Sequence, residues 1–67
     1  MVNGQKIRDL MLSKGIDGMD MAERVGISGQ MMSFIIRGLR EPNVTTLARI
    51  AHELGVTVDD LIKKEVV

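Results

Sequence analysis

Apolar residues recur along this sequence at helical spacing, and glycines separate the apolar segments. No stretch alternates between apolar and polar residues with the period of two that a strand requires, and no segment repeats. The clearest helix is expected between an N-cap at Asn43 and a stop at Gly55. It has the i, i+3, i+4, i+7 pattern of one buried face, at Leu47, Ile50, Ala51 and Leu54. The pattern predicts an all-α chain.

Three helices are expected before this segment, each with a capping residue in front and a glycine behind. Polar residues such as Asn, Asp and Ser favour the N-cap, and glycine favours the left-handed conformation after the last turn. The expected segments run from Asn3 to Gly15, from Asp17 to Gly26 and from Ser28 to Gly38. Their expected inward residues are Ile7, Leu10, Met11, Met21, Ala22, Val25, Met32 and Ile35.

A short fifth helix is expected near the end of the chain. Thr57 and Asp60 have the spacing of a capping box, with Asp in place of the usual Glu. This helix would turn three apolar residues inward and place two lysines at its C-terminal end, where positive charge complements the helix dipole: Val58, Leu61, Ile62, Lys63 and Lys64. The whole chain, residues 1–67, is then one domain.

The second and third helices have the spacing of a helix-turn-helix, at about residues 17–38. A small residue at Ala22 lets the two helices approach, and Gly26 can adopt the positive φ of the tight turn. Ile27, Met32 and Ile35 can hold the second of these helices to the core. The spacing by itself is a weak signal, since other packed helix pairs with a glycine between them share it.

Longer stretches of the chain resemble the Cro/phage-repressor family of helix-turn-helix proteins. The resemblance runs without a gap from about Lys6 to Lys64 and is carried by KIRDLMLSKG, AERVGIS, RGLREPNVTTL and LARIAHELGVTVDDLI. It implies a compact five-helix, lambda-repressor-like DNA-binding domain. It also implies sequence-specific binding of double-stranded DNA by a transcriptional regulator that acts as a symmetric dimer.

The resemblance also indicates which residues face DNA. It implies base contacts from Gln30, Ser33 and Phe34, and backbone contacts from Arg37, Arg40 and Asn43. Gln30 can bond adenine in a bidentate manner, and Phe34 and Met31 can contact thymine methyl groups. Lys14 and Arg24 are further basic candidates. Three family positions that usually carry polar or basic side chains hold Gly18, Gly29 and Phe34 instead.

These departures support a second hypothesis, a protein-binding or homodimerising module. If Met32 and Ile35 face inward, Met31 and Phe34 should share a largely exposed stripe. Together with Met19 they would form an apolar cluster flanked by Gly18 and Gly29. Exposed apolar clusters commonly bind proteins, and Met suits adaptable interfaces. The surface of residues 18–36 would then have been converted, by evolution or by engineering, to bind a protein partner or a second copy.

Composition and charge limit the remaining classes of function. The chain has 67 residues, no Cys and a net charge of zero, with six Lys/Arg and four Asp/Glu in residues 1–40 against three and five in residues 41–67. His52 is the only histidine, Ser28 is explained as an N-cap, and Asp59 and Asp60 suit a helix N-terminus. We therefore expect no catalysis, metal, cofactor, small-molecule substrate or membrane contact, and a cytoplasmic location.

Overall fold

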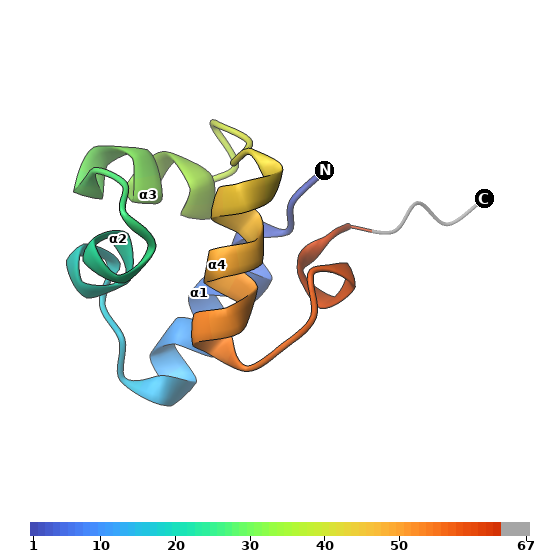
Figure 1. The fold of residues 1–67 in the computed structure, drawn as a ribbon, viewed down its shortest axis with the longest axis horizontal. Helices are drawn as coiled ribbons and strands as arrows, with labels where there is room; N and C mark the ends of the chain where they lie inside the picture. The colour runs from blue at the N-terminus through green and yellow to red at the C-terminus, as the bar shows by residue number, and fades with distance from the viewer. Residues whose placement is uncertain (64–67) are drawn as a thin grey trace.

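A computed structural model describes residues 1–63 of the chain. In this part the chain forms α-helices and one short 3₁₀ helix, and the all-α helix-turn-helix fold is confirmed (Figure 1). The elements are α1 (Gly4–Lys14), α2 (Gly18–Val25), α3 (Gly29–Ile36), α4 (Val44–Leu54) and η1 (Asp59–Leu61). None of the described helices is long and apolar enough to cross a membrane.

Each α-helix begins at the N-cap that the sequence predicts. The side chains of Asn3, Asp17, Ser28 and Asn43 accept a hydrogen bond from the backbone N–H three residues further on, at 2.7–3.1 Å. Helices α1, α2 and α4 end at glycines in the left-handed conformation, Gly15, Gly26 and Gly55. Helix α3 ends at Arg37, and Gly38 follows with a φ of 76°. These local signals account for where all four α-helices begin and for where α1, α2 and α4 end, whereas α3 ends one residue before its expected stop.

The helices enclose one apolar core. Every predicted inward residue of α1 to α4 is buried except Leu10 and Leu47, which are half-buried and pack against the core. Val2 and Ile16, which the helical pattern did not identify, are also buried. The complete set is Val2, Ile7, Met11, Ile16, Met21, Ala22, Val25, Met32, Ile35, Ile50, Ala51, Leu54 and Leu61.

The expected fifth helix is instead a single 3₁₀ turn. The capping box is present, since the Thr57 N–H donates to Asp60 Oδ2 at 2.9 Å and the Asp60 N–H donates to Thr57 Oγ1 at 3.3 Å. The chain then leaves the helix at Ile62, whose backbone is extended and forms an isolated antiparallel bridge with Val2. Lys63 therefore has no helix end to complement, and Lys64 lies outside the described residues.

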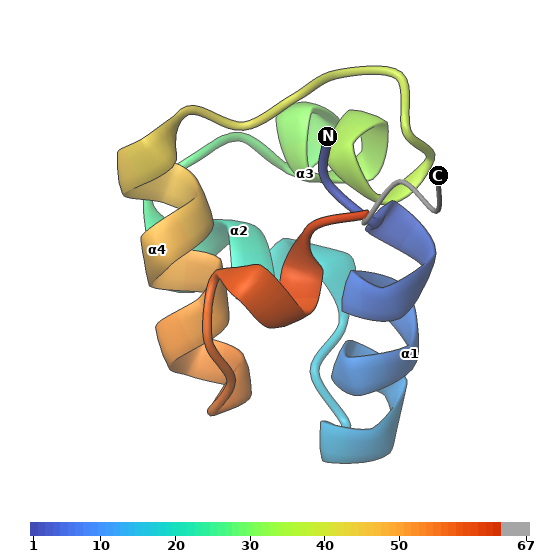
Figure 2. The ribbon, with the colours of Figure 1, turned by 90° about the vertical axis from the view of Figure 1, so that its right-hand side faces the viewer.

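The N-terminal residues cause this early end. The Asn3 N–H donates to the Leu61 carbonyl at 2.6 Å, and the Lys63 N–H donates to the Met1 carbonyl at 2.8 Å. Figure 2 shows the first residues beside the segment that follows η1. The pairing buries Val2, so the terminal segments complete the core that the helices leave open.

Helix α3 lies at one end of the molecule, where α2 and the beginning of α1 support it (Figures 1 and 2). The approach of α1 is very close. A Cβ at Gly4 would lie 2.6 Å from the carbonyl oxygen of Ile35 and would meet that of Ile36 as well. Glycine at position 4 therefore lets the first turn of α1 pack directly against the last turn of α3.

Candidate nucleic-acid interface

A tight turn sets the position of α3 relative to α2. Gly26 has a φ of 78°, and the N–H groups of Gly26 and Ile27 both donate to the Ala22 carbonyl, at 2.9 and 3.0 Å. Ala22 is buried, as the small residue of a helix-turn-helix should be. Arg49 of α4 donates from Nη1 to the Val25 carbonyl at 3.4 Å. Both helices are therefore held firmly at the turn.

The outward face of α3 carries the residues expected to read bases. Met32 and Ile35 are fully buried, and Gln30 and Ser33 lie exposed on the opposite side of the helix. Phe34 is half-buried and Asn43 is exposed next to α4. The fold thus presents an amide and a hydroxyl group on one exposed helix face.

Phe34 lies beneath two arginines. The guanidinium carbons of Arg37 and Arg40 are 5.4 and 6.0 Å from the centre of its ring, within the range of cation–π contacts. The ring is therefore not the centre of a bare apolar patch, because it helps to place two positive charges next to the reading face.

No acidic residue neutralises these arginines within the described structure. The sequence has no Asp or Glu between positions 25 and 40. Glu41 follows Arg40 directly, but its carboxylate accepts hydrogen bonds from the Val2 N–H at 2.8 and 3.3 Å and lies 3.9 Å from the amino terminus. The fold thereby directs Glu41, the acidic residue nearest to Arg40 in sequence, toward the N-terminal segment.

A hollow of about 680 Å³ adjoins the reading face between the first turns of α2 and α3. Three helices contribute to its lining: Arg8, Asp17, Gly18, Met19, Gly29, Ser33, Ile36 and Arg37. Arg8, which the sequence analysis missed, reaches this surface because the beginning of α1 packs on the end of α3. In the sequence Arg8 is one of several exposed basic residues of α1, and no local signal distinguishes it.

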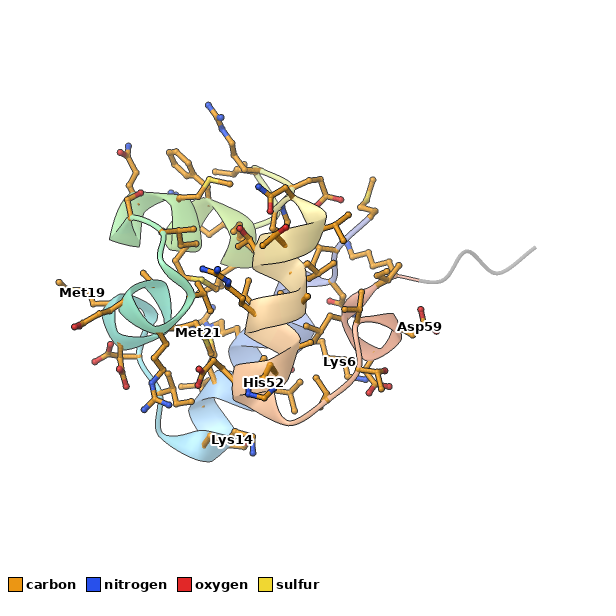
Figure 3. All side chains as sticks on the ribbon, viewed as in Figure 1. Lys6, Lys14, Met19, Met21, His52 and Asp59 are labelled. Atoms are coloured by element: carbon orange, nitrogen blue, oxygen red, sulfur yellow. The ribbon has the colours of Figure 1, made fainter. Side chains whose placement is uncertain are left out.

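Two basic candidates do not belong to this surface. The Arg24 guanidinium pairs with Asp20 at 3.1 Å and with Glu53 of α4 at 3.3 Å, and the hydrogen bonds to these carboxylates raise its pKa. Lys14 ends α1, and Figure 3 shows it at the end of the molecule opposite α3. The expectation for both residues was wrong, because Lys14 lies at the far end of α1 and ion pairs hold the Arg24 side chain to Asp20 and Glu53.

The expected apolar cluster is also divided. The expectation of a largely exposed stripe was wrong, because Phe34 is half-buried, and so is Met31, which packs against the core. Its direction differs by only about 40° from that of the buried Ile35, four residues further along the helix. Met19 is 79% exposed, and Figure 3 shows it pointing outward from α2 while Met21 points inward. Met19 and Met31 therefore do not form one exposed cluster.

The histidine considered for catalysis or metal binding, His52, lies away from α3. His52 is exposed on α4 and lines a shallow hollow with Arg49 and Glu53 (Figure 3). Within residues 1–63, no group of three or more His, Cys, Asp or Glu side chains is arranged to hold a metal ion.

Two curated relatives match this chain over most of its length. It is 36% identical over 59 residues to the uncharacterized HTH-type transcriptional regulator y4dJ of Sinorhizobium fredii, covering 88% of this chain and 77% of the relative. It is 33% identical over 60 residues to the SPbeta prophage-derived uncharacterized HTH-type transcriptional regulator YonR of Bacillus subtilis. That match covers 90% of this chain but only 56% of YonR, so the chain spans about half of that relative.

Solved structures share the fold. The P22 c2 repressor in complex with a synthetic operator matches with a TM-score of 0.88 and 26% identity, over 97% of this chain and 98% of the repressor. The biofilm regulator SinR in complex with DNA matches with a TM-score of 0.81 and 30% identity, over 90% of this chain and 97% of SinR. A helix-turn-helix family model matches residues 7–61. The chain therefore belongs to the Cro/phage-repressor family of helix-turn-helix proteins.

Proposed function

We propose that this chain binds a specific sequence of duplex DNA through α3 and regulates transcription. The observation that carries the proposal is the positive charge of Arg37 and Arg40, which form no ion pair within residues 1–63, beside the exposed Gln30 and Ser33. Phosphate contacts position such a protein on DNA, and base-edge contacts give it specificity. The helix-turn-helix structures that hold an operator or DNA support this assignment.

Each residue then has a defined role. Gln30 is the base reader, because its amide can both accept from and donate to adenine. Ser33 adds a hydrogen bond that does not discriminate among bases, and Phe34 can contact a thymine methyl group. Arg37, Arg40 and Asn43 bind the backbone, and Arg8 adds a phosphate contact from α1.

One amide reader gives little specificity, so we propose that two copies bind together. A bidentate pair contributes about 1–3 kcal/mol of discrimination against the wrong base. A symmetric dimer presents the same residues twice, to half-sites about 34–36 Å apart. The proposal includes a cytoplasmic location.

The test compares arginines that face α3 with one that does not. The protein is titrated with a selected duplex and with a mixed duplex over a range of salt concentrations. Arg40→Ala and Arg8→Ala should each weaken binding to both duplexes and reduce the salt slope by about 1. Arg24→Ala is the matched control, since Arg24 is paired with carboxylates on another surface. The proposal fails if the parent binds neither duplex at low salt.

Base reading is tested separately. Gln30→Ala should bring the affinities for the selected and mixed duplexes closer by about 1–3 kcal/mol for each half-site, the value of one bidentate contact. Binding to the mixed duplex should change little, because the arginines remain. Unchanged discrimination would show that Gln30 does not read a base.

Protein binding through residues 18–36 is the second candidate. Met19 is the member of the expected cluster that remains strongly exposed, beside the open positions of Gly18 and Gly29. Light scattering on the free protein tests this function. Self-association that Met19→Ala removes, in a protein that does not bind DNA, would favour it over DNA recognition.

A further inference from the structure

Met19 and Gly29 form an unusual pair in the hollow beside the reading face. Glycine leaves the first position of α3 without a side chain, where the reading helix approaches base edges. Met19 comes from the first turn of α2 and lies next to this position. Its Cγ is 3.9 Å from the point that a Cβ of residue 29 would occupy, an ordinary van der Waals distance.

The outer part of the Met19 side chain is free to act on a partner. The residue is 79% exposed, although Met is apolar and α2 has an apolar core face at Met21 and Val25. The thioether sulfur and the methyl group lie beyond Cγ and more than 4 Å from that point, so rotation about the side-chain bonds brings them over Gly29. Met19 can therefore fill the space that a side chain at position 29 would take.

The charges around the hollow indicate that DNA would cover it. Arg8 and Arg37 line it from α1 and from the end of α3. The acid in the lining, Asp17, has its carboxylate engaged as N-cap, where it accepts from the Asp20 N–H at 2.7 Å. Two positive charges thus line the same hollow as Met19, against one carboxylate that is held at a helix N-terminus.

On these grounds we propose that Met19 is a specificity-determining residue that recognises the 5-methyl group of a thymine in place of a side chain at position 29. The inference rests on the proposed DNA binding. The thymine methyl is the apolar group that an A·T pair shows in the major groove, whereas the other groups there are hydrogen-bond donors or acceptors. A flexible, polarizable thioether suits contact with a methyl group.

The experiment removes that methyl group alone. A binding site is first selected from random duplexes with the parent protein, and each thymine is then replaced singly by deoxyuridine. The parent should lose about fourfold in affinity at one thymine per half-site, as expected for one buried methyl group. Met19→Ala should bind the thymine and uracil duplexes equally at that position and keep the effects of all other substitutions.

Leu12→Ala is the matched control. Leu12 is 68% exposed on α1, and Figures 1 and 2 show the end of α1 far from α3. This variant loses a comparable exposed side chain and should keep the sensitivity to uracil. Circular dichroism should show the parent helix content for both variants, because neither residue is in the core.

Two outcomes would overturn the inference while leaving DNA binding intact. The parent could bind its selected site with no sensitivity to uracil, or Met19→Ala could keep the full sensitivity at the same thymine. The second result would assign the methyl contact to another residue, such as Phe34. Failure to select any site would instead overturn the proposed function, and the inference with it.

Discussion

Three helices of this protein begin with glycine, and the three glycines have different structural environments. Gly4 begins α1 against the end of α3, and a Cβ there would overlap the carbonyl oxygens of Ile35 and Ile36. Gly18 begins α2 with no atom within 4 Å of a Cβ, and Gly29 begins α3 with only Met19 at 3.9 Å. The fold requires the first glycine and does not require the other two.

The different surroundings of the three glycines indicate which of them serves packing and which can serve binding. Glycine in a helix is less favourable than alanine by roughly 0.5–1 kcal/mol, because the unfolded chain loses more conformational freedom. At Gly4 this cost is offset by the close contact of two helices. At Gly18 and Gly29 nothing in the described structure offsets it, which is consistent with clearance for a partner outside the chain.

Gly4→Ala should have the largest effect on stability. Its methyl group must displace backbone atoms of α3, and overpacking of this kind costs about 1–3 kcal/mol or more. Urea denaturation should therefore show a large decrease in the midpoint. Because the beginning of α1 positions α3, DNA affinity should fall even where the variant remains folded. A midpoint equal to that of the parent would show that α1 and α3 can separate at no cost.

Ser28→Ala should have an intermediate effect. The Ser28 hydroxyl accepts from the Met31 N–H at 3.0 Å and caps α3 directly before Gly29. Loss of such a cap costs typically about 1 kcal/mol. Thermal unfolding should report a lower midpoint. No change would mean that water replaces the cap, and that the beginning of α3 depends on the turn at Gly26 instead.

Gly18→Ala and Gly29→Ala should have the smallest effect on stability. Their Cβ atoms meet open space or an ordinary contact, so each variant should be neutral or up to about 1 kcal/mol more stable. The same urea titration checks this against Gly4→Ala. Destabilisation of either variant would contradict the contrast between the three glycines.

Gly18→Ala and Gly29→Ala also test whether these positions leave room for DNA. If Gly18 and Gly29 provide clearance, a more stable protein should bind its selected duplex more weakly. Stability and affinity would then change in opposite directions, a pattern that a packing defect does not produce. Equal affinity in all three proteins would show that DNA does not approach these positions closely.

Much of the reading helix could be predicted from local sequence. Ser28 marked its beginning, and Met32 and Ile35 marked its inward face, whereas its end at Arg37 comes one residue before the expected stop at Gly38. The exposure of Met31 could not be predicted in this way. Periodicity gives the direction of a side chain from the helix axis, whereas its burial depends on how much of the helix its neighbours cover, and that is a tertiary property.

The surroundings of the charged residues in the candidate site could not be predicted from local sequence either. Sequence alone placed Arg37 and Arg40 at the end of α3, but it could not show that Phe34 lies under both or that Glu41 turns to the amino terminus. Arg8 was missed and Arg24 was assigned wrongly for the same reason. Their roles depend on contacts between residues far apart in sequence, such as Arg24 with Glu53.

The sequence by itself determined the four α-helices, because caps, positive-φ glycines and apolar spacing act within one or two turns of the chain. It also determined the helix-turn-helix, whose key residues lie within 14 positions from Ala22 to Ile35. Only the tertiary structure decided where the last helix ends. Pairing of the N-terminal residues with the segment after η1 satisfies backbone groups and buries Val2, and these contacts replace a further helical turn.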